Sequence, residues 1–247
     1  MAEIKERSGD SLGDRMKGYE AVSSGALTRR CPVIVRVDGK AFHSWTRGME
    51  KPFDRRLVNW MREATQATAR AMQGCVLAYV QSDEASFLLT DWKEDGSQPW
   101  MGYALSKVVS LSAATFTACF NMATALVNFK PNGPAIFDAR AFNVPREDVA
   151  NCFLWRAKDW RRNSIQGLAQ AHFSAKQLHG VSMEAALNML MEKGVDWNFL
   201  DSDLRCGSFF FPSRWTWAYD VEPHYKEVAA VVDAGMEMAE SREAGGD

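Results

Sequence analysis

Two apolar stretches interrupted by acidic residues constrain the fold of this chain more than any other feature. The first, Val33–Lys40, is a β-branched run that reaches Asp38 and a glycine. The second, Ala78–Leu89, is a pair of apolar runs joined at Ser82-Asp83-Glu84. Such runs favour buried strands, and the second stretch has the length of a hairpin. If both belong to one sheet, Asp38 and Asp83 meet at the same edge.

The surrounding segments predict an α+β fold with a ferredoxin-like palm. Residues 53–72 have helical spacing, and Gly74 ends that helix. Residues 105–126 predict a second packed helix, and residues 131–134 turn the chain into a short final strand at 135–138. The resulting order, β-α-β-β-α-β, is the split unit found in polymerase palms. This order alone does not indicate a function, because the fold hosts many. The apolar positions that carry the first helix are Leu57, Trp60, Met61, Ala64, Ala67 and Ala71.

The chain divides into three predicted regions. A palm-type catalytic domain with an N-terminal arm, helical or extended, covers residues 1–144. A mostly helical, RNA-contacting region covers 145–239, with helices at 147–171, 174–179 and 183–193 and a small hairpin formed by 205–211 and 215–220. Residues 240–247 form a polar tail that we expect to be disordered.

Composition and charge argue against several classes of protein. The net charge is −2, so a nucleic-acid surface has to come from local clustering of basic residues. The five cysteines form no C-x-x-C pair, which argues against a disulfide framework and structural zinc. The first residues are charged, and no run approaches the ~20 apolar residues of a membrane span. We therefore predict a cytoplasmic protein without a membrane partner.

Asp38 and Asp83 are candidate Mg²⁺ ligands. Acids at two adjacent strand ends suit divalent metals at a phosphoryl-transfer site. The Gly39 carbonyl can add a ligand, and the amides that follow it can point together at a phosphate. The alternative is an ordinary Asp-Gly turn and a solvated hairpin tip. Glu84 is a weaker candidate, because side-chain alternation directs it to the opposite face from Asp83.

Basic residues supply further candidates. Lys51 and Lys107 lie near helix starts, where each is either a surface residue or a contact for triphosphate oxygens. The stretch Trp155–Asn163 holds four basic residues and two tryptophans. It can follow a phosphate backbone and stack a base, or it can be a helix with a basic outer face and its tryptophans in the core.

Longer motifs resemble those of one enzyme family. The stretch Val35–His43 resembles the R-[IV]-D-G-[RK]-x-F-H signature of the tRNA-histidine guanylyltransferase family, and Gln81–Phe87 resembles its Q-S-D-E-x-S-F motif. The resemblance runs from about residue 15 to about residue 171. Four shorter motifs also match: K-P-x-D at Lys51–Asp54, S-K at Ser106-Lys107, F-D-[GA]-R at Phe137–Arg140 and W-R-x-x-D at Trp155–Asp159.

The resemblance implies a palm-type polymerase that adds nucleotides to the 5′ end of RNA in the 3′-to-5′ direction. A 5′-monophosphate is activated by ATP or GTP, the 3′-hydroxyl of an incoming nucleoside triphosphate attacks, and pyrophosphate is released. The implied partners are tRNA or another 5′-monophosphorylated RNA and nucleoside triphosphates, and the implied assembly is a homotetramer.

The same resemblance implies roles for individual residues. Two Mg²⁺ ions bind Asp38, the Gly39 carbonyl and Asp83. The backbone amides of Lys40, Ala41, Phe42 and His43 hold a triphosphate, Arg36, Lys51, Ser82 and Lys107 contact nucleotide phosphates, and His43 positions the nucleotide. The RNA contacts that we predict are Arg140, Arg156, Lys158, Arg161, Arg162 and Asn163.

One departure from the family changes the expected activity. After W-R-x-x-D the eukaryotic members read C-H-I-N-N-L-Y-N, whereas residues 160–167 here keep only Asn163 and have Arg161 at the histidine position. That motif accompanies untemplated guanosine addition to tRNA-His. The sequence is more similar to the guanylyltransferase-like branch of bacteria, archaea and phages, which prefers template-dependent repair of tRNA 5′ ends.

Two other functions fit the same motifs. A palm-type nucleotidyltransferase or cyclase with DNA or a free nucleotide as its acceptor would use the same pair of acids. A non-catalytic nucleic-acid-binding protein could retain the palm as a scaffold, although the intact acidic motifs argue against it. A screen of labelled acceptors distinguishes the first alternative, and RNA binding that is insensitive to Asp38→Ala distinguishes the second.

Overall fold

The computed structural model describes residues 11–94, 96–125 and 133–240. Predictions for residues 1–10, for the turn at 131–132 and for the tail at 241–247 lie outside these ranges. The helices and strands are α1 (Leu12–Ala21), β1 (Val33–Gly39), α2 (Phe42–Trp45), α3 (Arg55–Ala71), β2 (Cys75–Gln81), β3 (Glu84–Leu89), α4 (Leu105–Ala125), β4 (Phe137–Asn143), α5 (Val149–His172), α6 (Ala175–Leu178), α7 (Met183–Glu192), α8 (Ser202–Cys206), β5 (Ser208–Phe211), β6 (Thr216–Ala218) and α9 (Tyr225–Glu240).

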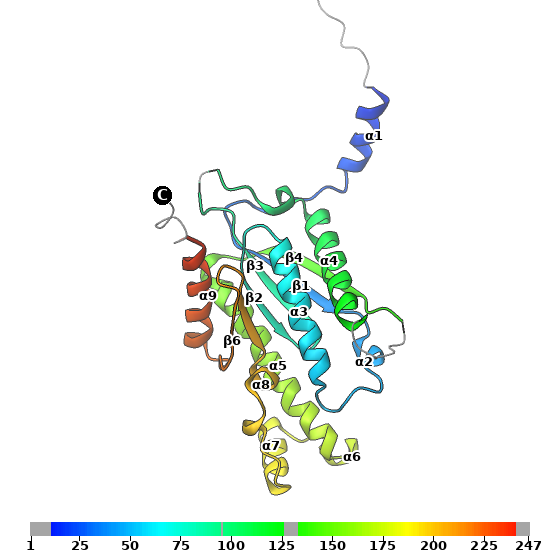
Figure 1. Ribbon diagram of the computed structural model, residues 1–247, viewed down its shortest axis with the longest axis vertical. Helices are drawn as coiled ribbons and strands as arrows, with labels where there is room; N and C mark the ends of the chain where they lie inside the picture. The colour runs from blue at the N-terminus through cyan, green and yellow to red at the C-terminus, as the bar shows by residue number, and fades with distance from the viewer. Residues whose placement is uncertain (1–10, 95, 126–132, 241–247) are drawn as a thin grey trace, which may run out of the picture.

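The strands form a 6-stranded antiparallel sheet in the order β4-β1-β3-β2-β5-β6. The first four have the order expected of a ferredoxin-like palm, so the predicted α+β class is confirmed (Figure 1). The final palm strand is longer than predicted, because β4 pairs with β1 along its whole length from Phe137 to Asn143.

The small hairpin is an extension of the palm sheet. Residues Ala78–Val80 of β2 pair with Ser208–Phe210 of β5, and β5 then pairs with β6. The sheet therefore continues across the predicted boundary at residue 144. The assignment of catalysis to one side of that boundary and RNA contact to the other stays a prediction.

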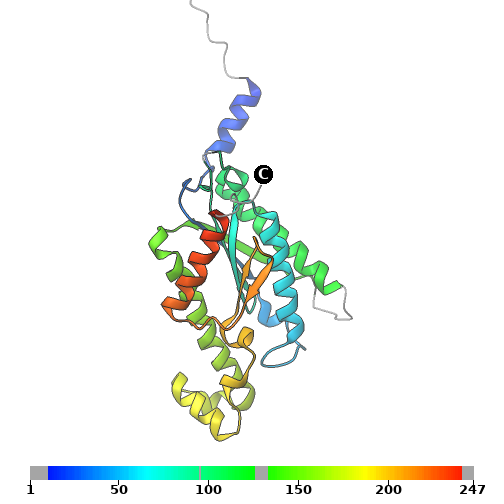
Figure 2. The same cartoon turned by 60° about the vertical axis from the view of Figure 1, so that its left-hand side comes forward.

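Helices cover both faces of the sheet (Figures 1 and 2). Along β1, Val33, Val35 and Val37 face a core shared with α3 and α4. Ile34 lies in a second core shared with α5 and α9. Because successive side chains of a strand alternate between faces, a strand that is buried on both sides reads as a continuous apolar run. This is why Val33–Val37 lacks the alternation of an exposed sheet.

Helix α3 begins at a side-chain cap. Asp54 is its N-cap and accepts a hydrogen bond from the Arg56 amide over 2.9 Å. The predicted inner positions Trp60, Met61 and Ala64 are buried, but Ala67 and Ala71 are exposed. Small threonine side chains take part in the packed face instead, which a pattern of strictly apolar residues misses; the buried residues of α3 are Trp60, Met61, Ala64, Thr65, Thr68 and Ala69.

Helix α4 is long and apolar enough, by length and composition alone, to cross a membrane. This differs from the expectation that no such run exists. Its inner side chains Val108, Phe116 and Phe120 are fully buried in the core between α4 and the sheet. Helices that pack against a core commonly have this composition, and α4 accordingly belongs to the palm.

Beyond the sheet, α5 continues into a third cluster with α7. Ile165 and Leu168 of α5 pack there against Leu190 of α7 and Trp197. Short helix α8 and long helix α9 were not among the predicted elements. Helix α9 completes the second core with Val228 and Val232, so it is part of the main body rather than of a tail.

Candidate active site

The two acidic motifs meet at one edge of the sheet. Asp38 lies near the end of β1, and Asp83 lies in the two-residue turn between β2 and β3. The Gly39 amide donates a hydrogen bond to the Asp83 carbonyl over 3.0 Å. Asp38 is also the cross-strand partner of Glu84. Backbone contacts therefore hold the hairpin turn beside the end of β1, which is the convergence that the sequence predicted.

Close packing explains the glycine after Asp38. A Cβ atom added to Gly39 would lie 2.3 Å from the Phe42 ring. Phe42 is buried and packs against Phe137, with ring centroids 4.9 Å apart. Its side chain therefore supports the turn after β1. Ala41 and Ser82 flank this edge in the left-handed region, with φ of 54° and 46°, and strained backbone of this kind clusters at functional sites.

Both candidate metal ligands have raised pKa values. Burial is the largest cause of the raised pKa of Asp38, and the negative charge of Asp138 adds to it. Burial also raises the pKa of Asp83, although the Ser82 hydroxyl donates a hydrogen bond to its carboxylate over 3.0 Å. The ionised carboxylates are thus incompletely stabilised by the protein alone. A bound cation would stabilise both of them.

The pair fits Mg²⁺ when phosphates provide the other ligands. Proteins usually hold Mg²⁺ through one or two carboxylates together with substrate phosphates, and seldom through a cage of side chains. In the described parts of the chain, no group of three or more acidic, histidine or cysteine side chains could hold a metal ion. Asp38 and Asp83 therefore suit a metal that arrives with a nucleotide.

A cavity of about 310 Å³ opens beside Asp83, between α2, α3 and the ends of β2 and β5. His43, Lys51 and Ser82, three of the predicted nucleotide contacts, line it. His43 shares a hydrogen bond of 3.0 Å with the Ser44 hydroxyl. The structure thus brings these three residues together with Asp83 at one opening.

The four backbone amides that follow Gly39 fall into two groups. The Lys40 amide donates to the Ile136 carbonyl over 2.8 Å, so this amide serves the fold and is not free to hold a phosphate as predicted. The amides of Ala41, Phe42 and His43 lie at the start of α2, where N–H groups precede the first intrahelical bonds. Their role as phosphate contacts stays a prediction.

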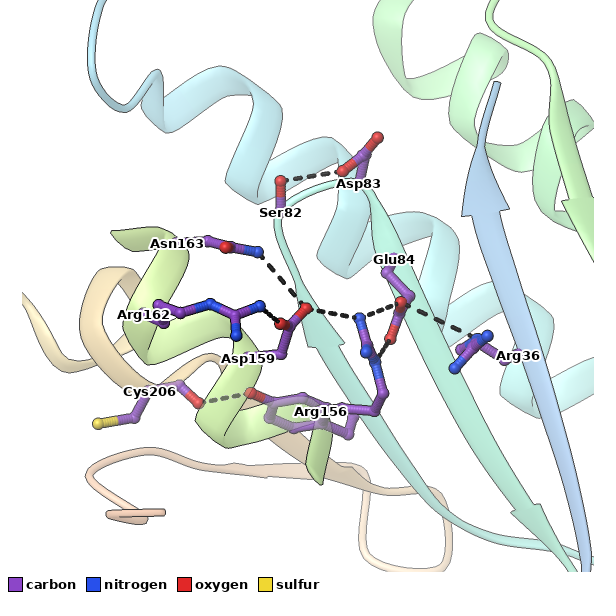
Figure 3. A network of polar contacts seen from close by, with 10 residues as sticks. Arg36, Ser82, Asp83, Glu84, Arg156, Asp159, Arg162, Asn163 and Cys206 are labelled. Carbon is purple, nitrogen blue, oxygen red and sulfur yellow. Dashed lines mark hydrogen bonds and ion pairs between the residues drawn. The ribbon is translucent and has the colours of Figure 1, made fainter. Parts of the chain in front are cut away.

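Glu84 faces away from Asp83 into a network with α5 (Figure 3). Its two carboxylate oxygens accept hydrogen bonds from Nε and Nη2 of Arg156, each over 2.7 Å. Arg156 also donates to Asp159 over 3.2 Å, and Arg36 lies 4.0 Å from the Glu84 carboxylate. The exposed Trp155 ring stacks against both arginine guanidiniums. The network joins the β2–β3 hairpin to α5.

The predicted RNA contacts therefore separate into two groups. In the first group the arginines already have partners within the protein. Arg156 forms an ion pair with Glu84, and Arg161 lies 3.9 Å from the Glu222 carboxylate with its guanidinium over the Trp197 ring. Lys158, Arg162 and Asn163 are exposed. Arg162 and Asn163 also bond to Asp159, which keeps them on the same side of α5 (Figure 3).

Two predicted contacts lie apart from the cavity. Lys107 lies in the first turn of α4. The part of α4 near the acids is marked by Thr117, whose hydroxyl accepts a hydrogen bond from the Phe137 amide, and Phe137 is the cross-strand partner of Gly39. The ten residue steps of helix from Lys107 to Thr117 span about 15 Å, so a single chain does not bring Lys107 to the acids. Arg140 lies on β4, exposed and 3.3 Å from Asp138.

Several cavity residues were not among the predicted site residues, although Trp160 lies in the basic stretch Trp155–Asn163, whose tryptophans were expected to stack a base or to pack in the core. Trp160 lines the cavity and packs against Phe53, with ring centroids 6.1 Å apart. Asp203 of α8 lines it as well and binds Arg55 of α3 through two hydrogen bonds of 2.8 and 2.7 Å. Arg62 of α3 lies 3.8 Å from the same carboxylate. These contacts depend on long-range packing, which leaves no local pattern in the sequence.

Comparison with known proteins gives a consistent result. The profile of the family described as tRNAHis guanylyltransferase (Thg1) matches residues 13–145, more than half of the 247-residue chain. A bacterial Thg1-like protein solved in complex with ATP is 36% identical, with a TM-score of 0.83 over 93% of this chain and 99% of that one. A structure of such a protein with GTP is 32% identical, with a TM-score of 0.74 over 93% of this chain and 99% of that one.

Two further relatives are less similar in sequence. The tRNA(His) guanylyltransferase of Schizosaccharomyces pombe is 29% identical over 215 residues, which are 79% of this chain and 78% of that protein. An uncharacterised protein of Acanthamoeba polyphaga mimivirus is 27% identical over 78% of this chain and 73% of its own length. With the family profile, the shared fold and the paired acidic motifs in agreement, the chain belongs to the tRNAHis guanylyltransferase family of nucleotidyltransferases.

Proposed function

We propose that the protein is a Mg²⁺-dependent 3′-to-5′ nucleotidyltransferase that adds nucleotides to the 5′ end of RNA. The observation that carries this proposal is the bond from the Gly39 amide to the Asp83 carbonyl, which holds two desolvated carboxylates at one sheet edge. Nucleotide addition to tRNA is the activity named for its relatives, including that of Schizosaccharomyces pombe.

Asp38 and Asp83, with the Gly39 carbonyl, are the residues we assign to two Mg²⁺ ions. When bound, such ions would stabilise the charge that develops on transferring phosphoryl groups. The Ser82 hydroxyl orients the Asp83 carboxylate through its 3.0 Å bond. Glu84 is held on the other face by Arg156 and takes no part in metal binding in this account.

The cavity beside Asp83 is the proposed site of the activating nucleotide. Its volume of about 310 Å³ is at the lower end of the range of small-ligand sites, roughly 300–1,000 Å³. Lys51 and His43 line it and can approach phosphate and base. Thg1-like proteins similar to this chain have been solved with ATP and with GTP, which supports either nucleotide as the activator.

The RNA substrate that we propose is a tRNA with an incomplete 5′ end. Arg161 replaces the histidine of the motif that accompanies untemplated addition, which favours template-dependent repair. Lys158, Arg162 and Asn163 offer an exposed polar surface on α5 for the RNA backbone. We also propose a cytoplasmic location and a homotetramer; α1, which buries none of its side chains within the single chain, is available for such contacts.

An extension assay tests this function. A 5′-monophosphorylated tRNA that lacks its first nucleotide is incubated with ATP, Mg²⁺ and each nucleoside triphosphate in turn. We expect addition of only the nucleotide complementary to the opposing base. Guanosine addition regardless of the template would contradict the repair assignment. No addition to tRNA, combined with addition to DNA or a free nucleotide, would favour a different acceptor.

A further inference from the structure

A second and larger cavity lies at the opposite end of the sheet from Asp83. Its volume is about 510 Å³, and it opens between the end of α3, the start of β2 and the β5–β6 turn, with Thr90, Lys93, Ser97 and Gln98 along its side. The Thr90 amide donates to the Gly74 carbonyl at its floor, where β2 begins. The 7 residues of β2 separate this end of the sheet from Asp83 by about 20 Å. We call this cavity the far groove.

The far groove has the chemistry of a polyanion site. Arg70 of α3 and Lys93 line it together with the amide side chains of Gln73 and Gln98. None of the described residues that line it is acidic, although the chain as a whole has 31 acidic and 29 basic residues. This local excess of cations contrasts with the net negative charge of the protein. It complements the charge of a phosphate backbone.

Trp215 stands at the wall of the far groove in a strained conformation. It belongs to the turn between Phe211 and Thr216, and its φ of 56° is in the left-handed region. That conformation is unfavourable for an L-residue, and hairpin turns usually place glycine or asparagine there. The ring is 50% exposed and meets Phe210 edge-on at 5.2 Å. A bulky residue held exposed at such a position indicates a function other than packing.

A row of aromatic rings and cations connects the far groove with the cavity beside Asp83. Trp215 and Trp217 both contact the Phe210 ring, with centroid distances of 5.2 and 4.9 Å. Arg62 of α3 lies 4.8 Å from the Trp217 ring and 4.9 Å from the Tyr219 ring, and it lines the cavity beside Asp83. In Figure 2 the orange hairpin lies beside the cyan helix α3, which carries both Arg62 and Arg70.

We propose that the far groove binds an unpaired strand of the RNA substrate, with Trp215 as the platform on which a base stacks. Arg70 and Lys93 contact the phosphates on either side of that base. Grooves that combine cations with exposed aromatic rings bind single strands in this way, because every base offers a π-face. The inference rests on the proposed function, which requires an RNA substrate. It adds a second contact about 20 Å from the reacting 5′ end.

Substitution of Trp215 gives the direct test. Trp215→Gly removes the ring and suits the left-handed backbone, so this variant keeps the fold. Trp215→Phe retains a stacking surface. The dissociation constant is measured by filter binding with a 5′-monophosphorylated duplex RNA that carries a single-stranded 3′ extension, and with the blunt duplex. We expect Trp215→Gly to weaken binding of the extended RNA about 5- to 150-fold and Trp215→Phe to lie within a few-fold of wild type.

A matched control and a charge variant complete the design. Tyr225, an aromatic residue of α9 with similar exposure (51%), is changed to alanine and should leave binding unchanged. The double variant Arg70→Gln, Lys93→Gln should lower the slope of log K against log salt by about 1.4, because each phosphate contact on a single strand contributes about 0.7.

The outcomes separate the inference from the function on which it rests. Wild-type affinity of Trp215→Gly for the extended RNA would overturn the inference, and so would equal weakening for the blunt duplex. The binding assay requires no catalysis. If the wild-type protein adds no nucleotide and Trp215→Gly still weakens RNA binding, the proposed activity is contradicted and the role of the far groove is supported. Normal binding together with templated addition would contradict only the groove.

Discussion

At the scale of single residues, two neighbouring acids where the β2–β3 turn meets β3 have opposite surroundings. Asp83 has a raised pKa because of burial, and no arginine contacts its carboxylate in the described structure. Glu84 is clamped by Arg156 through two bonds of 2.7 Å. Side-chain alternation predicts that the two acids face opposite sides, and the structure agrees. The partner of Glu84 was not predictable, because Arg156 is 72 residues away in the sequence.

Asp83→Asn should raise the stability of the metal-free protein near neutral pH and abolish nucleotide addition. A carboxylate whose pKa is raised by folding destabilises the folded state above that pKa, and this cost disappears as the pH falls below the unfolded value near 3.8. The loss of a metal ligand should reduce addition by about 100-fold or more.

The measurement is thermal unfolding at several pH values, with and without Mg²⁺. The melting temperature of the variant should exceed that of wild type without Mg²⁺ at pH 7, and the difference should vanish near pH 3. Asp233→Asn, an exposed acid of α9, is the control. An Asp83→Asn protein that still adds nucleotides at the wild-type rate would contradict the metal assignment.

The pair Glu84–Arg156 should show strong coupling in stability. Both side chains are largely buried, with exposures of 7% and 14%. Removal of one partner leaves the other with only its weaker contact, which is Asp159 for Arg156 over 3.2 Å and Arg36 for Glu84 at 4.0 Å. Glu84→Gln and Arg156→Gln should therefore each destabilise the protein by less than the roughly 3–5 kcal/mol typical of a buried charge left unpaired, and the double variant by much less than their sum. Urea unfolding of the four proteins gives the cycle, and additive losses would show that the pair is not coupled.

At the scale of elements, α3 illustrates what the sequence could and could not predict. Its presence followed from spacing and is confirmed, and the helix ends at Ala71, three residues before the predicted stop signal Gly74. The residues that face the core were partly wrong, because Thr65 and Thr68 are buried while Ala67 is exposed. Thr65 is accommodated through a bond from its hydroxyl to the Met61 carbonyl over 2.7 Å. A threonine whose hydroxyl bonds to the backbone of its own helix can be buried, and a search for apolar residues alone overlooks it.

The start of α3 gives a prediction for Asp54. Its hydrogen bonds with the Arg56 side chain lower the pKa of Asp54 to about 2. The ordinary value is 3.8, so the ionised cap contributes stability that is fully present above pH 3.8 and is lost as the pH falls towards 2. Solvent screens the half-exposed Arg56 guanidinium, so this contribution is at most about 2 kcal/mol. Asp54→Ala should destabilise the protein at pH 7 and much less at pH 2.

Asp54→Asn separates the two contributions of this side chain. Asparagine caps a helix as well as aspartate but forms no ion pair with Arg56, so this variant should lose less stability than Asp54→Ala. Chemical unfolding at pH 7 and pH 2 measures both variants. A loss for Asp54→Ala that is the same at both pH values would contradict the role assigned to the ionised cap.

At the scale of the whole molecule, the palm depends on the second half of the chain. Ile34, Tyr79 and Leu88 of the palm strands are buried in the core that α5 and α9 complete. The ββ pairing of β2 with β5 removes what would otherwise be an open edge. The sequence predicted the palm order well, because its signals are local. It did not predict this coverage, because the partners come from residues 149–240, far along the chain from the palm strands.

A fragment of residues 1–144 should therefore not fold by itself. It would expose one apolar face of the sheet and the edge of β2, which are buried in the full chain. We expect no cooperative thermal transition by circular dichroism and strong binding of a hydrophobic dye. The full chain is the control. A fragment that melts cooperatively would show that the palm is an independent domain.

The direction of synthesis is the central claim about the whole molecule. In 3′-to-5′ addition the incoming nucleotide attacks with its own 3′-hydroxyl, whereas in ordinary polymerisation the RNA supplies that group. The most direct measurement is extension of a 5′-monophosphorylated tRNA whose 3′ end is chemically blocked, with either a normal or a 3′-deoxy nucleoside triphosphate. The account predicts addition of the normal nucleotide and none of the 3′-deoxy form. Addition of the 3′-deoxy nucleotide, or a requirement for a free RNA 3′ end, would contradict it.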